Sequence, residues 1–112
     1  MGISAEEMRK LVREKMMKLK YNIDKDPKFK VLFEKNFDIV YDEYLTRLGN
    51  TFPELTVSDK KLCAYLKMDL SSKEIAPLMN LTYRSVEMTR YRLRKKLNLS
   101  REQNLIEFLQ RF

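Results

Sequence analysis

Helix start signals recur along this chain, and no stretch alternates apolar and polar residues as a half-buried strand does. A helix commonly begins after a Ser, Thr or Asp whose side chain caps its first turn, and an acid or amide three residues later strengthens the signal. Such positions in this chain are Ser4, Asp26, Thr56 or Ser58, Ser71, Thr82 and Ser100. We therefore predict an all-α fold, a helical bundle of about six or seven helices.

The first stretch after Ser4 carries a narrow apolar stripe with charged residues on both sides. Its members are spaced by four, four, three and four residues: Met8, Val12, Met16, Leu19 and Ile23. This spacing suits a helix that packs against another helix. Packing on its own domain and a short coiled-coil dimer seam are both compatible with the pattern.

A second stripe, mostly aromatic, follows the helix start at Asp26-Pro27. Its members recur at helical spacing: Phe29, Phe33, Phe37, Tyr41, Tyr44 and Leu48. Stacked aromatic residues can bind nucleic-acid bases, but such a stripe is far more often a core face. We predict a core stripe, divided into two helices by a break near residues 36–38.

The composition lacks the usual signatures of catalysis. The chain has no His, two Gly and one Cys, and Cys63 lies in an apolar stretch typical of a core residue. Imidazole bases, nucleophile pairs that need His, and Gly-rich phosphate loops are therefore excluded. No apolar run reaches the ~20 residues that span a bilayer. We predict a cytoplasmic protein that is not an enzyme, with no cofactor, no metal site and no membrane partner.

The segment from Ser71 to Leu97 predicts two helices joined by only three residues, Asn80 to Thr82. Such a short connection forces a steep crossing. Asn80 can adopt the left-handed conformation that ends the first helix, Ala76 leaves room for the second, and Leu81 and Val86 supply apolar contacts between them. These features are typical of a helix-turn-helix, whose second helix enters the major groove of DNA.

The second helix of this pair separates its side chains into two faces at about 100° per residue. Val86, Arg90, Leu93 and Leu97 share the inward side, and we predict that Arg90 forms a structural ion pair with Glu74. The exposed groups suited to reading bases are Arg84, Glu87, Met88 and Tyr91. The later cations suited to phosphates are Arg92, Lys95 and Lys96.

The charge distribution also favours an anionic partner for this half of the chain. The net charge is +7, and residues 51–112 hold 12 basic against 7 acidic side chains. Basic residues gathered on the second helix of a helix-turn-helix point to double-stranded DNA.

Three sequences, Leu55-Thr56, SSKEIAPLMNLTYRSVE and RKKLNL, resemble the LuxR-type, GerE-like helix-turn-helix regulators of bacteria. The resemblance implies a four-helix DNA-binding domain over residues 51–112, behind a helical linker or dimerisation segment over residues 1–50. Such a module often forms the C-terminal domain of a larger regulator that also carries a sensor region. The resemblance makes Tyr83 to Leu97 the recognition helix.

The family's reading helix faces DNA at positions occupied here by Thr82, Arg84, Ser85, Met88 and Lys95. Thr82 and Ser85 thereby become phosphate candidates. Ser72 and Lys73 join them because helix N-termini attract anions. The family often dimerises through its last helix, so a homodimer is expected, and RNA polymerase is a further candidate partner. The resemblance implies regulation of transcription on the nucleoid.

Two alternatives remain open at the level of the sequence. One is a promoter-binding element similar to region four of a sigma factor, whose helix-turn-helix looks alike. The other is a helical adaptor that binds an acidic protein through the same basic face.

Overall fold

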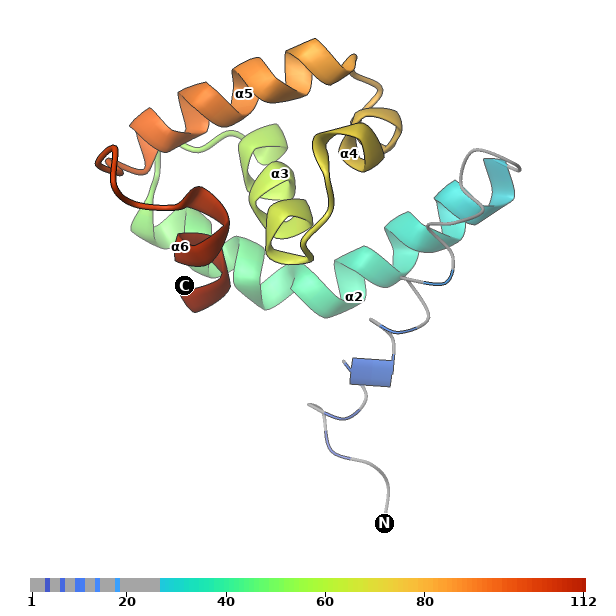
Figure 1. The fold of residues 1–112 in the computed structure, drawn as a ribbon. Coiled ribbons are helices and arrows are strands. Elements are labelled where there is room, and N and C mark those ends of the chain that lie inside the picture. Colours follow the sequence, from blue (N-terminus) through green and yellow to red (C-terminus); the bar gives the residue numbers. More distant parts are fainter. Residues whose placement is uncertain (1–3, 5–6, 8–9, 12–13, 15–17, 19–26) are drawn as a thin grey trace. The chain divides into compact units, whose positions relative to one another are not determined.

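The computed structural model describes residues 27–112, together with Ser4, Glu7, Lys10, Leu11, Glu14 and Lys18. All regular structure in this described part is helical, which confirms the all-α prediction (Figure 1). The helices are α2 (Pro27–Thr51), α3 (Val57–Lys67), α4 (Ser72–Met79), α5 (Tyr83–Lys96) and α6 (Leu105–Arg111). The chain divides into two compact units, Met1–Glu43 and Tyr44–Phe112. The predicted boundary between residues 50 and 51 stays a prediction.

In the first unit, the Ser4 cap is confirmed, because the Glu7 amide donates to Ser4 Oγ at 3.1 Å. Asp26 and the five members of the predicted apolar stripe lie outside the described residues. The aromatic residues Phe33, Phe37 and Tyr41 of α2 are buried, as predicted for a core stripe. The rings of Phe37 and Tyr41 lie 5.1 Å apart between centroids.

Helix α2 is continuous, so the predicted break near residues 36–38 is wrong. Asn36 does not compete with the helix, because its side-chain Nδ2 donates to the Leu32 carbonyl oxygen, four residues back, at 2.9 Å. That local bond satisfies the polar side chain without turning the backbone. The last turns of α2 belong to the second unit, where Tyr44 and Leu48 are buried.

Three helix starts in the second unit are confirmed. Thr56 and Ser71 form capping boxes with Asp59 and Glu74, and Thr82 Oγ1 accepts the Ser85 amide. The predicted start at Ser100 is wrong, because α6 begins at Leu105 with Asn104 as its cap. The amide of Gln103 donates to the carbonyl oxygen of Ser100 at 3.2 Å, so this segment closes a turn before the helix begins.

Helices α3, α4 and α5 end in the same way. A residue with positive φ follows each helix, Asp69 at 63°, Asn80 at 53° and Asn98 at 57°. A leucine comes next each time, and its amide donates to a carbonyl five residues back. This is the hydrogen-bond pattern of a Schellman cap, for which Asn and Asp here replace glycine.

The core of the second unit is formed by α3, which contacts both α5 and α6, while α5 also packs on α4. Figure 1 shows α5 running above α3 and α4. Leu62, Leu66, Ile75, Leu93 and Leu109 are fully buried. Cys63 is also buried, and that burial raises the pKa of its thiol to about 12, so it behaves as the predicted core residue.

Side chains from α2 and α3 bind the carbonyls at the end of α6. Tyr44 Oη donates to Leu109 O at 3.1 Å, and Lys67 Nζ donates to the same oxygen at 3.3 Å. Arg47 Nη2 reaches Phe112 O at 3.0 Å. Because the last carbonyls of a helix lack partners within it, these bonds hold α6 in place.

Candidate nucleic-acid interface

The helix-turn-helix pair is α4 and α5, joined by Asn80, Leu81 and Thr82. Asn80 adopts the predicted left-handed conformation, and the Leu81 amide donates to Ala76 O at 2.9 Å. Val86 is fully buried, while Leu81 keeps 38% of its surface exposed. The turn therefore closes on α4 through backbone bonds, and α5 is anchored by Val86.

The outward face of α5 is the face that the helical projection predicts. Six exposed side chains line one shallow, open hollow there: Arg84, Glu87, Met88, Tyr91, Arg92 and Lys95. Met88 and Tyr91 are 49% and 62% exposed. We call these six residues the α5 face. It combines donors, an acceptor and apolar surface in one place.

Within the α5 face, Lys95 lies over the ring of Tyr91, with Nζ 4.5 Å from the ring centroid. The two residues are one helical turn apart, so α5 itself sets their approach. A cation held over an aromatic ring is attracted by the ring's negative face. Lys95 therefore has a defined position near the end of the α5 face.

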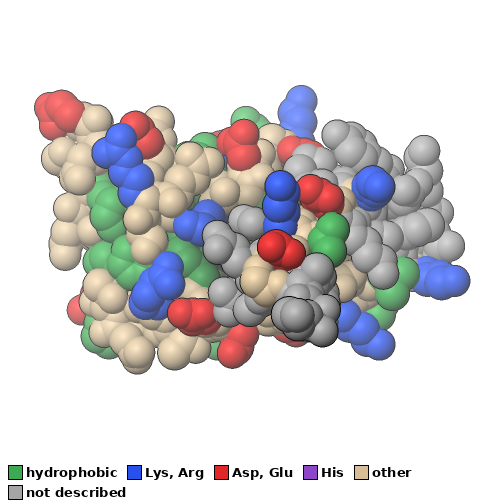
Figure 2. Space-filling view, turned by 90° about the horizontal axis from the view of Figure 1, so that it is seen from below, with side chains coloured by type: hydrophobic (Ala, Val, Ile, Leu, Met, Phe, Trp, Pro, Cys, Tyr) green, Lys and Arg blue, Asp and Glu red, His purple; other side chains and the backbone are tan. Residues whose placement is uncertain are grey.

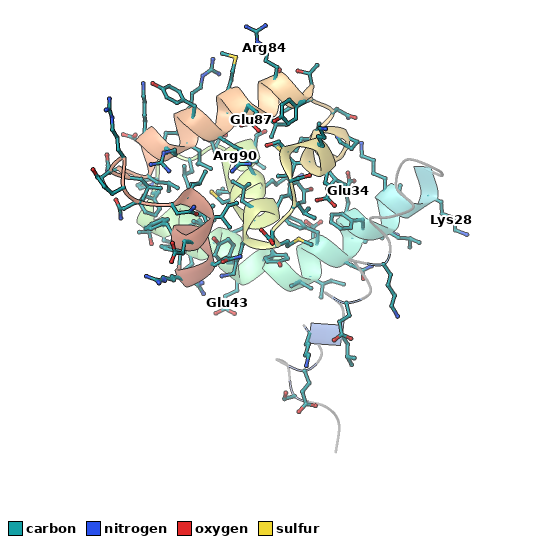
Figure 3. All side chains as sticks on the ribbon, in the orientation of Figure 1. Lys28, Glu34, Glu43, Arg84, Glu87 and Arg90 are labelled. Atoms are coloured by element: carbon teal, nitrogen blue, oxygen red, sulfur yellow. The ribbon has the colours of Figure 1, made fainter. Side chains whose placement is uncertain are left out.

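Arg90 points from α5 toward α4 and is half-buried, as predicted (Figure 3). Its Nη1 donates a hydrogen bond to Ser72 Oγ at 3.0 Å, and the ion pair with Glu74 stays a prediction. Glu74 Oε1 accepts the Ser71 amide in the capping box of α4. Arg90 thus joins α5 to α4 through a buried hydroxyl.

Two of the predicted phosphate contacts, Ser72 and Lys96, bind a partner on another helix. The Ser72 side chain is only 4% exposed and accepts from Arg90, so its hydroxyl is not presented to a ligand. Lys96 Nζ lies 2.6 Å from Asp59 Oδ2, in an ion pair that joins the end of α5 to the start of α3. Both side chains therefore contribute to the packing of the domain.

The remaining phosphate candidates stay accessible. Lys73, Thr82, Arg92 and Lys95 are exposed, and Ser85 is half-buried. Thr82 Oγ1 donates to Ser85 Oγ at 3.0 Å and accepts the Ser85 amide at 3.1 Å. These two hydroxyls therefore hold the first turn of α5 together at the edge of the α5 face.

Asp59 is the structural residue that sequence reasoning missed. Burial by itself raises the pKa of Asp59, but hydrogen bonds from Lys96 and Thr56 and the charge of Lys96 bring its pKa below the ordinary 3.8. Its carboxylate caps α3 and pairs with Lys96 at once. The spacing Thr56-x-x-Asp59 is a capping-box signal that could have indicated the first of these roles.

The described residues contain no group of three or more His, Cys, Asp or Glu placed to hold a metal ion. Among the helices of residues 27–112, none combines the length and apolar character that crossing a bilayer requires. Figure 2 views the molecule from below in Figure 1, and basic and acidic side chains are interspersed on that surface.

Comparisons with models of protein families, with curated proteins and with solved structures find no match for this chain. The chemistry of its own residues therefore carries the assignment of the interface.

Proposed function

We propose that this chain is a sequence-specific DNA-binding regulator of bacterial transcription, of the LuxR type, that inserts α5 into the major groove. In this proposal it acts in the cytoplasm, on the nucleoid, as a homodimer that contacts two half-sites about one helical turn apart. RNA polymerase is a candidate partner of the bound regulator. The resemblance of residues 51–112 to that family supports the proposal.

The single observation that carries the proposal is the α5 face, on the second helix of a helix-turn-helix pair. Arg84 stands in its first turn, and Met88 and Tyr91 follow on the next turns. Residues near the start of a recognition helix reach base edges. Guanidinium forks suit guanine, and apolar groups suit the thymine methyl group.

Two cations of the α5 face and one of α4 bind phosphates in this proposal. Lys73 lies in the first turn of α4, where backbone amides favour an anion, and Arg92 and Lys95 lie in the second half of α5. Phosphate contacts fix the position of the protein on the duplex, whereas base contacts discriminate sequence. Affinity for any duplex therefore comes from Lys73, Arg92 and Lys95. Preference for particular base pairs comes from the residues at the start of α5.

The test is the substitution Arg84→Ala, measured by fluorescence anisotropy on a duplex recovered from a random library. We expect a loss of about 1–3 kcal/mol in binding free energy and relaxed preference at one base pair. The control is Arg101→Ala, which removes the same charge from an exposed residue between α5 and α6. The control should leave base preference intact.

Failure of the wild-type chain to shift any duplex at low salt would overturn the proposal and favour an adaptor for an acidic protein. Equal losses for Arg84→Ala on all duplex sequences would contradict the role of Arg84 in base readout. Both variants remove exposed side chains, so their melting temperatures should match the wild type.

A further inference from the structure

Glu87 is the only acidic residue in α5, among six basic ones. It is exposed and lines the same hollow as Arg84 and Met88. On a surface that meets phosphates, a carboxylate weakens binding by repulsion unless a donor of the partner satisfies it. Glu87 therefore needs a specific role in the complex.

Two arginines of α5 lie close enough in sequence to pair with Glu87. Arg84 and Arg90 stand three residues before and after it, at a spacing where helical ion pairs form. Within the described part of the chain, however, no ion pair or hydrogen bond engages the Glu87 carboxylate. Arg90 is held by the buried Ser72 hydroxyl, and Figure 3 shows Arg84 pointing away from the domain. The carboxylate keeps its acceptor capacity for a ligand.

In the major groove, only two base groups donate hydrogen bonds, the N4 amino group of cytosine and the N6 amino group of adenine. Adenine also presents the acceptor N7 beside its donor, which repels a carboxylate, and guanine and thymine present acceptors at the corresponding edge. An ionised carboxylate only accepts. Cytosine is therefore the base that a free glutamate on this face fits best.

We infer that Glu87 selects a cytosine by accepting a hydrogen bond from its N4 amino group, close to the guanine that Arg84 contacts. The two residues lie three positions apart, about 4.5 Å along the helix axis. Base pairs are stacked about 3.4 Å apart. The cytosine therefore lies within two base pairs of the guanine. This inference rests on the proposed function and names the sequence that the same surface prefers.

The experiment is selection from a random duplex library with the wild-type chain and with Glu87→Gln. The wild type should enrich cytosine at one position by about tenfold. Glutamine offers a donor beside its acceptor and binds N6 and N7 of adenine, so Glu87→Gln should change the preference at that one position from cytosine to adenine. Glu87→Ala should lose the preference there without gaining adenine.

The matched control is Glu102→Gln, which removes the same charge from an exposed residue between α5 and α6. It should leave the enriched sequence unchanged. An enriched sequence that Glu87→Gln does not alter would overturn this inference and leave the proposed function standing. Glu87→Gln and Glu102→Gln could instead raise the affinity for all duplexes by the same amount. That result would also overturn the inference, because Glu87 would then act only by repelling phosphates. Absence of any enriched sequence with the wild type would overturn the proposed function as well.

Discussion

Asp59 shows how one side chain can hold two elements of the domain together. Its carboxylate accepts the Thr56 amide at 2.9 Å at the start of α3 and binds Lys96 at the end of α5. Asp59 is 7% exposed, so removing either partner leaves a buried polar group. The position of α5 against α3 therefore depends on an ionised carboxylate.

We expect this carboxylate to make stability depend on pH in the acid range. Because the pKa of Asp59 is lower in the folded chain than its ordinary 3.8, its contribution is present above that value and is lost as the pH falls through the folded pKa. Asp59→Asn should lower the free energy of unfolding by about 1.5–3 kcal/mol at neutral pH. Denaturant unfolding at a series of pH values should show this difference shrinking below pH 3.8.

The control for this prediction is Asp38→Asn, on an exposed position of α2. It should leave the free energy of unfolding close to that of the wild type across the same pH range. If the wild type and Asp59→Asn lose stability in parallel on acidification, the ion pair with Lys96 does not carry the effect.

At the scale of elements, the ends of α3, α4 and α5 share one device. A left-handed Asp or Asn is followed by a Leu whose amide closes the helix end. Left-handed backbone is costly for most residues, and Asn and Asp tolerate it better because their short side chains bond locally. The chain thus ends these helices sharply without glycine, which makes the three-residue turn before α5 possible.

The substitution Asn80→Ala should destabilise the domain by about 1 kcal/mol, because the left-handed conformation is sterically unfavourable for alanine. Asn80→Gly should cost less, since glycine adopts this conformation freely. Denaturant unfolding measures both, with Asn50→Ala within helical α2 as the control that should show no loss. Equal losses for Ala and Gly at position 80 would show that the side chain of Asn80, and not its backbone conformation, matters.

The helix starts that could be predicted from the sequence were those decided by local chemistry. Thr56, Ser71 and Thr82 bind amides only three residues away, so no distant partner is needed. The predicted start of α6 was wrong because two capping signals lie close together in the sequence. One is Ser100 with Gln103, and the other is Asn104 with Glu107. The predicted break in α2 was wrong because the side chain of Asn36 bonds to a carbonyl oxygen of the same helix.

The candidate site was predictable to the same extent. Helical periodicity separated the α5 face from the buried side, since that division depends on α5 alone. The contacts of Ser72 and Lys96 within the domain were not predicted, because their partners, Arg90 and Asp59, lie 18 and 37 residues away in the sequence. Spacing within a helix carries no information about such contacts, which follow from packing in three dimensions.

At the scale of the whole molecule, the net charge of +7 and its excess in residues 51–112 set the long-range attraction to an anionic partner. Three exposed cations at the proposed interface, Lys73, Arg92 and Lys95, are proposed to bind phosphates, whereas Lys96 is paired with Asp59. Each neutralised phosphate releases counterions, so the salt dependence of binding counts these contacts.

We expect the logarithm of the binding constant for a selected duplex to fall linearly with the logarithm of salt, with a slope of about −5. This value follows from three cations in each of two copies, at about −0.9 per phosphate, whereas a single bound copy gives about −2.7. Anisotropy titrations between about 50 and 200 mM salt measure the slope, and light scattering of the complex gives the number of copies independently.

Two variants make the count specific. Lys73→Ala should reduce the magnitude of the slope by about 1 for each bound copy, because one phosphate contact is lost. Lys96→Ala should leave the slope unchanged at temperatures where the variant stays folded, since Lys96 is paired with Asp59. A slope near zero for the wild type would contradict phosphate binding by this face. A Lys96→Ala slope reduced as much as that of Lys73→Ala would show that the ion pair opens when DNA binds.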